Sequence, residues 1–264
     1  MYLLDYHTHS QLSPDADFPL ADMARAAVAA GLSELCITDH YDTLSVEGRR
    51  AEPYDWAPAL AQFTAVREAF RGRLTLRLGI EFGSGHLDAS ALEGAPEELD
   101  FVIGSLHNRS EALGGVDFYY GPYDGPQVCA QTLEDYFTSM ERLAPLPVYD
   151  VLGHIIYPLR YMVRDGQSPS LAPYMERIRG ILKATVQSGR GIELNTYNGR
   201  TLADWKPVLA LYREVGGEIV TTGSDAHFPE NVGKGIREAC GLLRDCGFRY
   251  VAGYEGRKPS FTKL

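Results

Sequence analysis

The chain has 264 residues, of which 45% are hydrophobic and 23% charged, and its formal net charge is −10 at pH 7. This composition is typical of a soluble globular protein with a substantial core, and the acidic charge argues against nucleic acid as a partner. No apolar run is long enough to cross a membrane and the N-terminus does not resemble a signal peptide, so we expect a cytoplasmic protein without a membrane partner.

Short apolar runs alternate with longer helix-like segments. Strands are predicted at residues 2–7, 34–39, 74–81, 100–107, 149–154, 191–196 and 218–225. Helices are predicted at residues 20–30, 56–70, 133–143, 171–187, 202–215 and 235–246, and residues 108–131, rich in Gly, Tyr, Pro and Asp, predict a long loop. Seven such units without a linker predict an α/β fold, one closed or nearly closed β/α barrel formed by residues 1–264.

Six of the seven histidines fall at or just past the C-terminal end of a predicted strand: His7, His9, His40, His107, His154 and His227. A single histidine is more often a surface or hydrogen-bonded core residue than a metal ligand. However, the C-terminal ends of parallel barrel strands meet on one face, so these six become neighbours. Neutral imidazole is a good ligand for zinc, manganese or iron. His86 lies in a loop and is not expected to take part.

Carboxylates occupy similar positions. Glu81 ends the third predicted strand and Asp225 the seventh. His7 and His9 point to the same side of an extended segment, because side chains alternate along a strand. Asp15 lies in the first strand-to-helix loop, where a turn or cap residue is the simpler interpretation. The pattern predicts a metal site at the C-terminal ends of the strands.

These motifs, taken in order, resemble the full motif set of the PHP (polymerase and histidinol phosphatase) superfamily. They are HxH at 7–9, TDH at 38–40, GIE at 79–81, SxH at 105–107, GH at 153–154 and SDAH at 224–227. The start DYHTHSQLSPDA and the combination of Gly153-His154 with Arg160-Tyr161 are more narrowly similar to the PHP-type histidinol-phosphate phosphatases. The resemblance extends over nearly the whole chain.

The resemblance implies a distorted (β/α)7 barrel holding two to three divalent ions, with zinc, manganese or iron left open. It implies a first metal at His7, His9, Glu81 and Asp225, a second at Glu81, His107 and His154, and a third at Asp15, His40 and His227. Metals of this kind lower the pKa of a bridging water and draw charge from phosphoryl oxygens. The implied activity is phosphomonoester hydrolysis by a metal-bridging hydroxide, with L-histidinol phosphate, an intermediate of histidine biosynthesis, as the leading substrate.

Arg160 and Asp225 are predicted to be catalytic, and Arg160, Tyr161, Asp42, Asn195 and Arg200 to contact the substrate. Arg160 offers a planar fork for phosphate oxygens, although a surface arginine and a core tyrosine are the simpler interpretations of Arg160 and Tyr161. The chain departs from the pattern of the resembling phosphatases, which tend to carry an arginine after the Asn-Thr of the sixth strand. Here Tyr197 follows, so either Arg200 substitutes or the substrate differs.

Other functions remain open on the sequence alone. A PHP phosphoesterase could act on another small phosphomonoester or a nucleotide, with Tyr119, Tyr120 and Tyr123 as stacking groups, but the basic track that a nucleic acid requires is absent. A non-catalytic metal-binding module would usually have lost several ligands. A zinc amidohydrolase would need a lysine near a strand end, where neither Lys183 nor Lys206 is placed. The oligomeric state stays open.

Overall fold

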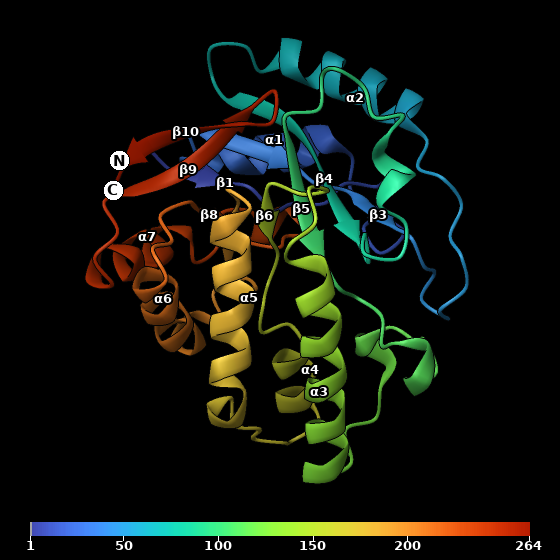
Figure 1. Cartoon of the computed structure of the whole chain (residues 1–264). Helices are drawn as coiled ribbons and strands as arrows, with labels where there is room; N and C mark the ends of the chain where they lie inside the picture. The colour runs from blue at the N-terminus through green and yellow to red at the C-terminus, as the bar shows by residue number, and fades with distance from the viewer. Residues whose placement is uncertain (1) are drawn as a thin grey trace.

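A parallel sheet lies at the centre of the structure, a computed structural model that describes residues 2–264 (Figure 1). Its strands lie side by side in chain order: β1 (Leu4–Asp5), β2 (Glu34–Ile37), β4 (Thr75–Gly83), β5 (Phe101–Ser105), β6 (Val151–Leu152), β7 (Gly191–Asn195) and β8 (Val220–Gly223). The short strand β3 (His40–Asp42) also pairs with β4 in parallel. All seven predicted strands are present, each shorter than predicted or shifted by one or two residues.

The sheet closes on itself between β8 and β1. The Tyr6 N–H donates to the Thr222 carbonyl at 2.8 Å, and the Asp225 N–H donates to the His7 carbonyl at 2.8 Å. Thr8 and Ala226 form an isolated parallel bridge just beyond the strand ends. These contacts complete a ring of strands, so the distorted seven-stranded β/α barrel predicted from the sequence is confirmed.

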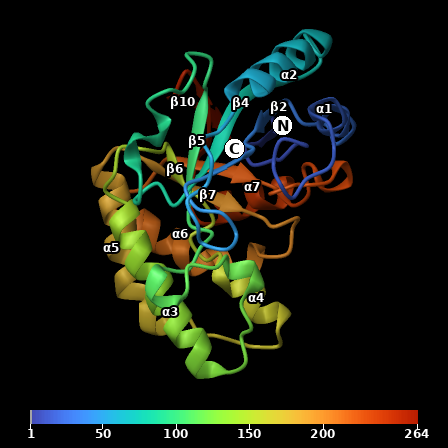
Figure 2. The ribbon, with the colours of Figure 1, turned by 90° about the vertical axis from the view of Figure 1, so that its right-hand side faces the viewer.

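Within the described residues, seven α-helices surround the barrel, with α2 and α5 on opposite sides of it (Figures 1 and 2). They are α1 (Leu20–Ala29), α2 (Trp56–Ala69), α3 (Pro126–Leu143), α4 (Pro158–Arg164), α5 (Met175–Gln187), α6 (Trp205–Glu214) and α7 (Ile236–Asp245). Helix α7 illustrates their pattern, since its buried residues Ile236, Ala239, Cys240 and Leu243 recur at helical spacing. Among residues 2–264, no helix combines the length and apolarity that a membrane crossing needs.

The segment between β4 and β5 contains no α-helix, so one of the seven predicted strand–helix units is incomplete. It holds only the 3₁₀ turn η1 (Ala89–Leu92). The other 3₁₀ turns are η2 (Glu111–Leu113), η3 (Phe118–Tyr120), η4 (Ala172–Tyr174), η5 (Leu202–Asp204) and η6 (Pro229–Asn231). The prediction of loop over residues 108–131 is wrong for its last part, because α3 begins at Pro126. Proline suits the first helical position, where its missing N–H would have no partner in the helix.

An antiparallel hairpin, β9 (Tyr250–Glu255) and β10 (Lys258–Lys263), follows the last helix and was not predicted. Strand β9 packs against buried side chains of the barrel strands, among them Tyr6 and Phe101. The ring centroids of Phe101 and Tyr254 are 4.9 Å apart, and those of Tyr6 and Phe101 are 5.1 Å apart. This apolar cluster fills the N-terminal part of the barrel, and the polar residues gather at the C-terminal ends of the strands.

Candidate metal centre

The predicted metal ligands come together at the C-terminal ends of the strands. Several groups of three have ligand atoms that all lie within 4.8 Å of one another: His7, His9 and Glu81; Glu81, His107 and His154; His9, His40 and His227; and His7, His154 and Asp225. Asp15 lies at the exposed rim of this cluster, with its side chain 55% exposed. Its Oδ2 is 3.2 Å from His227 Nε2 and 3.6 Å from His40 Nε2.

Glu81 lies at the centre of the cluster. Its Oε1 is 2.7 Å from His154 Nε2 and 3.0 Å from His107 Nε2. Its Oε2 is 3.1 Å from His7 Nε2 and 3.5 Å from His9 Nε2. Oε2 is also 3.2 Å from His40 Nδ1. The two oxygens therefore face two different groups of histidines, which is the arrangement that a carboxylate bridging two ions requires.

Carboxylates outside the cluster fix the protonation of two of its histidines. His7 Nδ1 is 2.6 Å from Glu193 Oε1, and His107 Nδ1 is 2.7 Å from Asp42 Oδ1. Because an ionised carboxylate can only accept a hydrogen bond, each Nδ1 carries the proton. The Nε2 atoms of His7 and His107 point toward Glu81 and are the atoms that would bind a cation.

Ser13 fixes which nitrogen of His9 carries the proton in the same way. The Ser13 hydroxyl donates to Asp39 Oδ1 at 2.9 Å, so its oxygen accepts from His9 Nδ1, which is also 2.9 Å away. Asp39 additionally accepts from the Ser10 N–H. Asp39 thus orients the predicted ligand His9 through Ser13.

The donor set fits divalent transition ions. The buried Nε2 atoms of His7 and His9 have no hydrogen-bond partner among residues 2–264. Burial lowers the pKa of His9 well below its ordinary value, and His227 and His40 act in the same direction, so this imidazole is neutral. Burial alone would raise the pKa of Glu81, but the surrounding histidines outweigh it and hold this pKa well below the usual range. Burial would lower the pKa of His7 and His107, but the neighbouring carboxylates outweigh it and hold both pKa values well above the ordinary value. A divalent ion would take the place of these protons, and imidazoles around an ionised carboxylate are ligands for zinc, manganese or iron.

Arg160 reaches the cluster from helix α4. Its side chain is only 5% exposed, its Nη1 donates to Asp225 Oδ2 at 2.7 Å, and its Nη2 donates to Asn195 Oδ1 at 3.2 Å. Asn195 Nδ2 also donates to Asp225 Oδ2 at 3.2 Å. Burial would raise the pKa of Asp225, but His7, His9 and Arg160 together lower it well below the usual range. Two predicted substrate residues, Arg160 and Asn195, therefore lie beside the predicted ligand Asp225.

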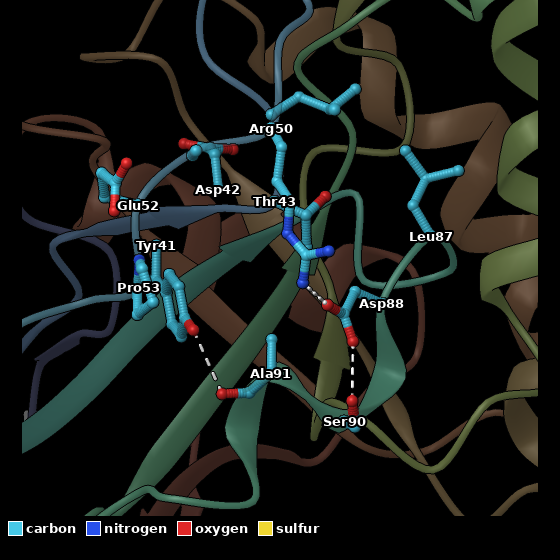
Figure 3. Close-up of a pocket in the computed structure, with 12 residues that line it drawn as sticks. Tyr41, Asp42, Thr43, Arg50, Glu52, Pro53, Leu87, Asp88, Ser90 and Ala91 are labelled. Carbon is cyan, nitrogen blue, oxygen red and sulfur yellow. Dashed lines mark hydrogen bonds and ion pairs between the residues drawn. The ribbon is translucent and has the colours of Figure 1, made fainter.

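Asp42 lies between the cluster and a neighbouring cavity of about 440 Å³ (Figure 3). Figure 3 shows it on the wall of a space bounded by the segment after β3 and by η1, with Glu52 and Asp88 also on this wall. Within that wall, Arg50 Nη2 donates to Asp88 at 2.8 Å. Asp42 thus contacts His107 and also lies on the cavity wall.

Tyr161 and Arg200, predicted to contact substrate, lie one side chain further out. The ring of Tyr157 stacks on His154 with 4.4 Å between centroids, and Tyr161 packs edge-on against Tyr157 at 5.1 Å. Arg200 is exposed, and its Cζ lies 5.4 Å from the centroid of the Tyr197 ring. Each is thus connected to the cluster through a tyrosine.

His86, which was not expected to take part, lines a different cavity of about 660 Å³ together with Arg109 and Arg142. Burial, with a smaller contribution from Arg142, lowers the pKa of His86 to about 4.

Sequence reasoning missed Glu193, Tyr157 and the position of Ser13. Glu193 could have been found, because it lies two residues before Asn195 on β7 and so faces the same side of the strand. A glutamate inside the apolar run Gly191–Asn195 is also unusual unless it has a partner. Tyr157 carried no such signal, since an aromatic residue three positions after His154 is ordinary core composition.

Several known proteins are similar to this chain over nearly its whole length. The PHP domain family matches residues 5–197. The histidinol-phosphatase of Lactococcus lactis is 26% identical over 100% of this chain and 98% of its own length. The probable histidinol-phosphatase of Deinococcus radiodurans is 30% identical over 94% of this chain and 95% of its own. A crystal structure of the Lactococcus lactis histidinol phosphate phosphatase with zinc, L-histidinol and phosphate superimposes with a TM-score of 0.84 and 22% identity, covering 98% of each chain.

Proposed function

This chain belongs to the PHP domain family, and we propose that it is a metal-dependent phosphatase that hydrolyses L-histidinol phosphate to L-histidinol and phosphate. The observation that carries the proposal is the position of Glu81, whose two oxygens face separate groups of histidines. The full-length relatives named histidinol-phosphatase support the substrate. This reaction would be a step of histidine biosynthesis.

We infer that two to three divalent ions bind, and that zinc, manganese or iron can serve. His7, His9, Glu81 and Asp225 would hold the first, Glu81 with His107 and His154 the second, and Asp15 with His40 and His227 the third. The groups of converging ligand atoms support the first two assignments. The distances from Asp15 to His227 and His40 support the third. The zinc bound to the structural neighbour from Lactococcus lactis is consistent with this donor set.

Such ions supply Lewis acidity to phosphoryl oxygens and a water of lowered pKa. The side chains of the chain itself do the remaining work. Glu193 and Asp42 hold a proton on Nδ1 of His7 and His107, so that Nε2 is the nitrogen left to bind an ion. Asp225 accepts a hydrogen bond from Arg160 Nη1 and Asn195 accepts one from Nη2, and these two bonds orient the guanidinium. The remaining N–H groups of Arg160 would bind phosphate oxygens, where a planar guanidinium is well matched.

The cavity beside Asp42 is the proposed place for the organic part of the substrate. Histidinol carries an amine and an imidazole. When the amine and the imidazole are protonated, carboxylates can pair with both. Three carboxylates, Asp42, Glu52 and Asp88, line the cavity against one arginine, Arg50, which is paired with Asp88. This excess of negative charge favours a cationic group. Tyr161 and Arg200 do not line this cavity, and they would approach the substrate from the side of Arg160 without touching the reacting atoms.

We propose that residues 1–264 form one PHP domain. Strand β8 lies beyond the segment that the family match covers, yet it precedes Asp225 and His227 and is hydrogen-bonded to the β1 segment. Without this strand the barrel would be open and the ligand set incomplete. A small phosphomonoester remains the proposed partner, with no nucleic acid.

Metal content tests the proposal. We expect elemental analysis of active protein to find two to three transition ions per chain. A chelator should abolish phosphate release from histidinol phosphate, because the Lewis acidity and the water of lowered pKa that the ions supply would be lost. Adding back zinc, manganese or iron should restore the activity. Fully active protein with less than one ion per chain would overturn the metal assignment.

A further inference from the structure

The guanidinium of Arg160 lies close to two aromatic rings. Its Cζ is 4.1 Å from the centroid of Tyr197 and 4.8 Å from the centroid of Tyr157. Both distances are within the range in which a cation is attracted to the face of an aromatic ring, about 6 Å. The hydrogen bonds to Asp225 and Asn195 use two of its five N–H groups among residues 2–264. The rings therefore hold the group while several donors stay available to a ligand.

Tyr197 has an unusual backbone conformation for a bulky residue. Its φ is +44° and that of Asn198 is +55°, both in the left-handed region. Local hydrogen bonds hold this turn, since the Tyr197 N–H donates to Asn195 Oδ1 at 2.8 Å and the Asn198 N–H donates to the Ser224 carbonyl at 2.9 Å. Asn195 Oδ1 also accepts from Arg160. Strained residues that their surroundings hold in place concentrate at functional sites.

The Tyr197 ring has a second cationic neighbour. Arg200 is exposed, and its Cζ lies 5.4 Å from the ring centroid. One half-buried ring thus contacts a buried guanidinium at the metal centre and an exposed one near the surface. Arg200 and Arg160 thus place two positive charges between the surface and Asp225, on a chain whose net charge is −10.

We propose that Tyr197 is a positioning residue for phosphate binding, holding Arg160 against the metal centre and keeping Arg200 beside it. This inference rests on the proposed phosphate contact of Arg160. Since the phosphate group is common to all phosphomonoesters, loss of the ring should weaken all of them alike. It should raise KM and weaken binding of inorganic phosphate, while kcat changes less, because no atom of Tyr197 is assigned to the reacting groups.

Two substitutions separate the ring from the backbone. Tyr197→Asn removes the ring but keeps a residue that tolerates left-handed φ, and Tyr197→Phe keeps the ring. We expect Tyr197→Asn to weaken binding of inorganic phosphate, measured by calorimetry on the metal-loaded protein, by about five- to thirtyfold. KM for p-nitrophenyl phosphate and histidinol phosphate should rise by the same factor. Tyr197→Phe should stay within about twofold of the wild type.

Tyr250→Asn is the matched control. Tyr250 is 43% exposed on β9, and the Arg249 Cζ lies 6.0 Å from its ring, so the same change removes a similar contact far from the cluster. It should leave phosphate binding unchanged. Should Tyr197→Asn fail to fold in thermal unfolding, Tyr197→Gly removes the ring and the backbone strain together and is tested in the same way.

A double-substitution cycle tests whether the ring acts through Arg160. In an Arg160→Ala background, Tyr197→Asn should have little further effect on phosphate binding. Wild-type affinity in Tyr197→Asn, an equal loss in Tyr197→Phe, or fully additive losses would each overturn the proposal. If the wild type hydrolyses p-nitrophenyl phosphate but not histidinol phosphate, the proposed substrate fails. The phosphate-binding comparison still decides the case of Tyr197.

Discussion

At the scale of single residues, the metal centre depends on which nitrogen of each histidine carries the proton. Glu193 and Asp42 accept from the Nδ1 atoms of His7 and His107, and Ser13 accepts from that of His9. Each contact directs an Nε2 atom into the cluster. The residues behind the predicted ligands would therefore govern how tightly these ligands bind an ion.

Glu193 gives the first prediction at this scale. Glu193→Gln keeps the shape of the side chain but removes the charge that makes His7 more basic, so the affinity for metal should fall by about ten- to a hundredfold. Titration of zinc into chelated protein measures it. Glu34→Gln is the matched control, because Glu34 is also a buried strand glutamate but pairs with Tyr6 and Arg77. An unchanged zinc affinity in Glu193→Gln would contradict this account of His7.

The nine predicted ligands were accessible to sequence reasoning for a physical reason. Each follows or ends a strand, apart from Asp15 in the first loop, and strand ends of a parallel barrel meet on one face. For Tyr197, the sequence indicated only that an arginine common in the resembling phosphatases is absent from this position. Its contact with Arg160 depends on the left-handed φ of a single turn, which the residue type does not predict. Side-chain identity thus predicted which residues gather in the cluster, and local backbone geometry decided what surrounds them.

At the scale of elements, the strands approach each other closely where they carry the cluster. Gly223 at the end of β8 lies against β7 and the segment after β1. A Cβ added there would lie 2.3 Å from Glu193 Oε1 and 2.4 Å from His7 Cβ. Only glycine leaves room for Glu193 and His7 to meet at 2.6 Å. The strand end is therefore shaped by the same contact that orients His7.

Gly223→Ala should consequently damage both stability and function. We expect it to lower the free energy of unfolding by roughly 1–3 kcal/mol, the usual cost of overpacking, and to lower kcat/KM by at least about tenfold through displacement of His7. Gly180→Ala is the control, because a Cβ on Gly180 in α5 meets nothing within 4 Å. It should raise stability by up to about 1 kcal/mol without changing kcat/KM. Denaturant unfolding and steady-state kinetics measure both, and a silent Gly223→Ala would be inconsistent with this packing.

Elements were predicted well where periodicity was strong and poorly where it was short. Strands β2, β4 and β7 stand out as apolar runs, and helices α1 and α7 by their spacing. The start of α3 at Pro126 was missed because the preceding Gly, Tyr and Pro residues resemble loop. The β9–β10 hairpin was missed because half of its residues face solvent, leaving a weak alternation. The position of the hairpin at the N-terminal part of the barrel comes from tertiary packing on Tyr6 and Phe101.

At the scale of the whole molecule, barrel closure joins the two ends of the ligand set. His7 and His9 follow β1, Asp225 and His227 follow β8, and hydrogen bonds between these segments align them. The molecule as a whole is acidic, so the attraction for a phosphate must come from bound ions and from Arg160. An acidic cavity beside them, lined by Asp42 and Glu52, suits the cationic remainder of the proposed substrate.

Substrate discrimination tests this account most directly. Groups placed to pair with an amine and an imidazole are left unpaired by a substrate that lacks them, and such a site rejects that substrate strongly. We predict that kcat/KM for L-histidinol phosphate exceeds that for p-nitrophenyl phosphate by about a hundredfold or more, measured by phosphate release from metal-loaded protein. Faster hydrolysis of a nucleotide or sugar phosphate than of histidinol phosphate would contradict the proposed substrate and leave a PHP phosphatase of different specificity.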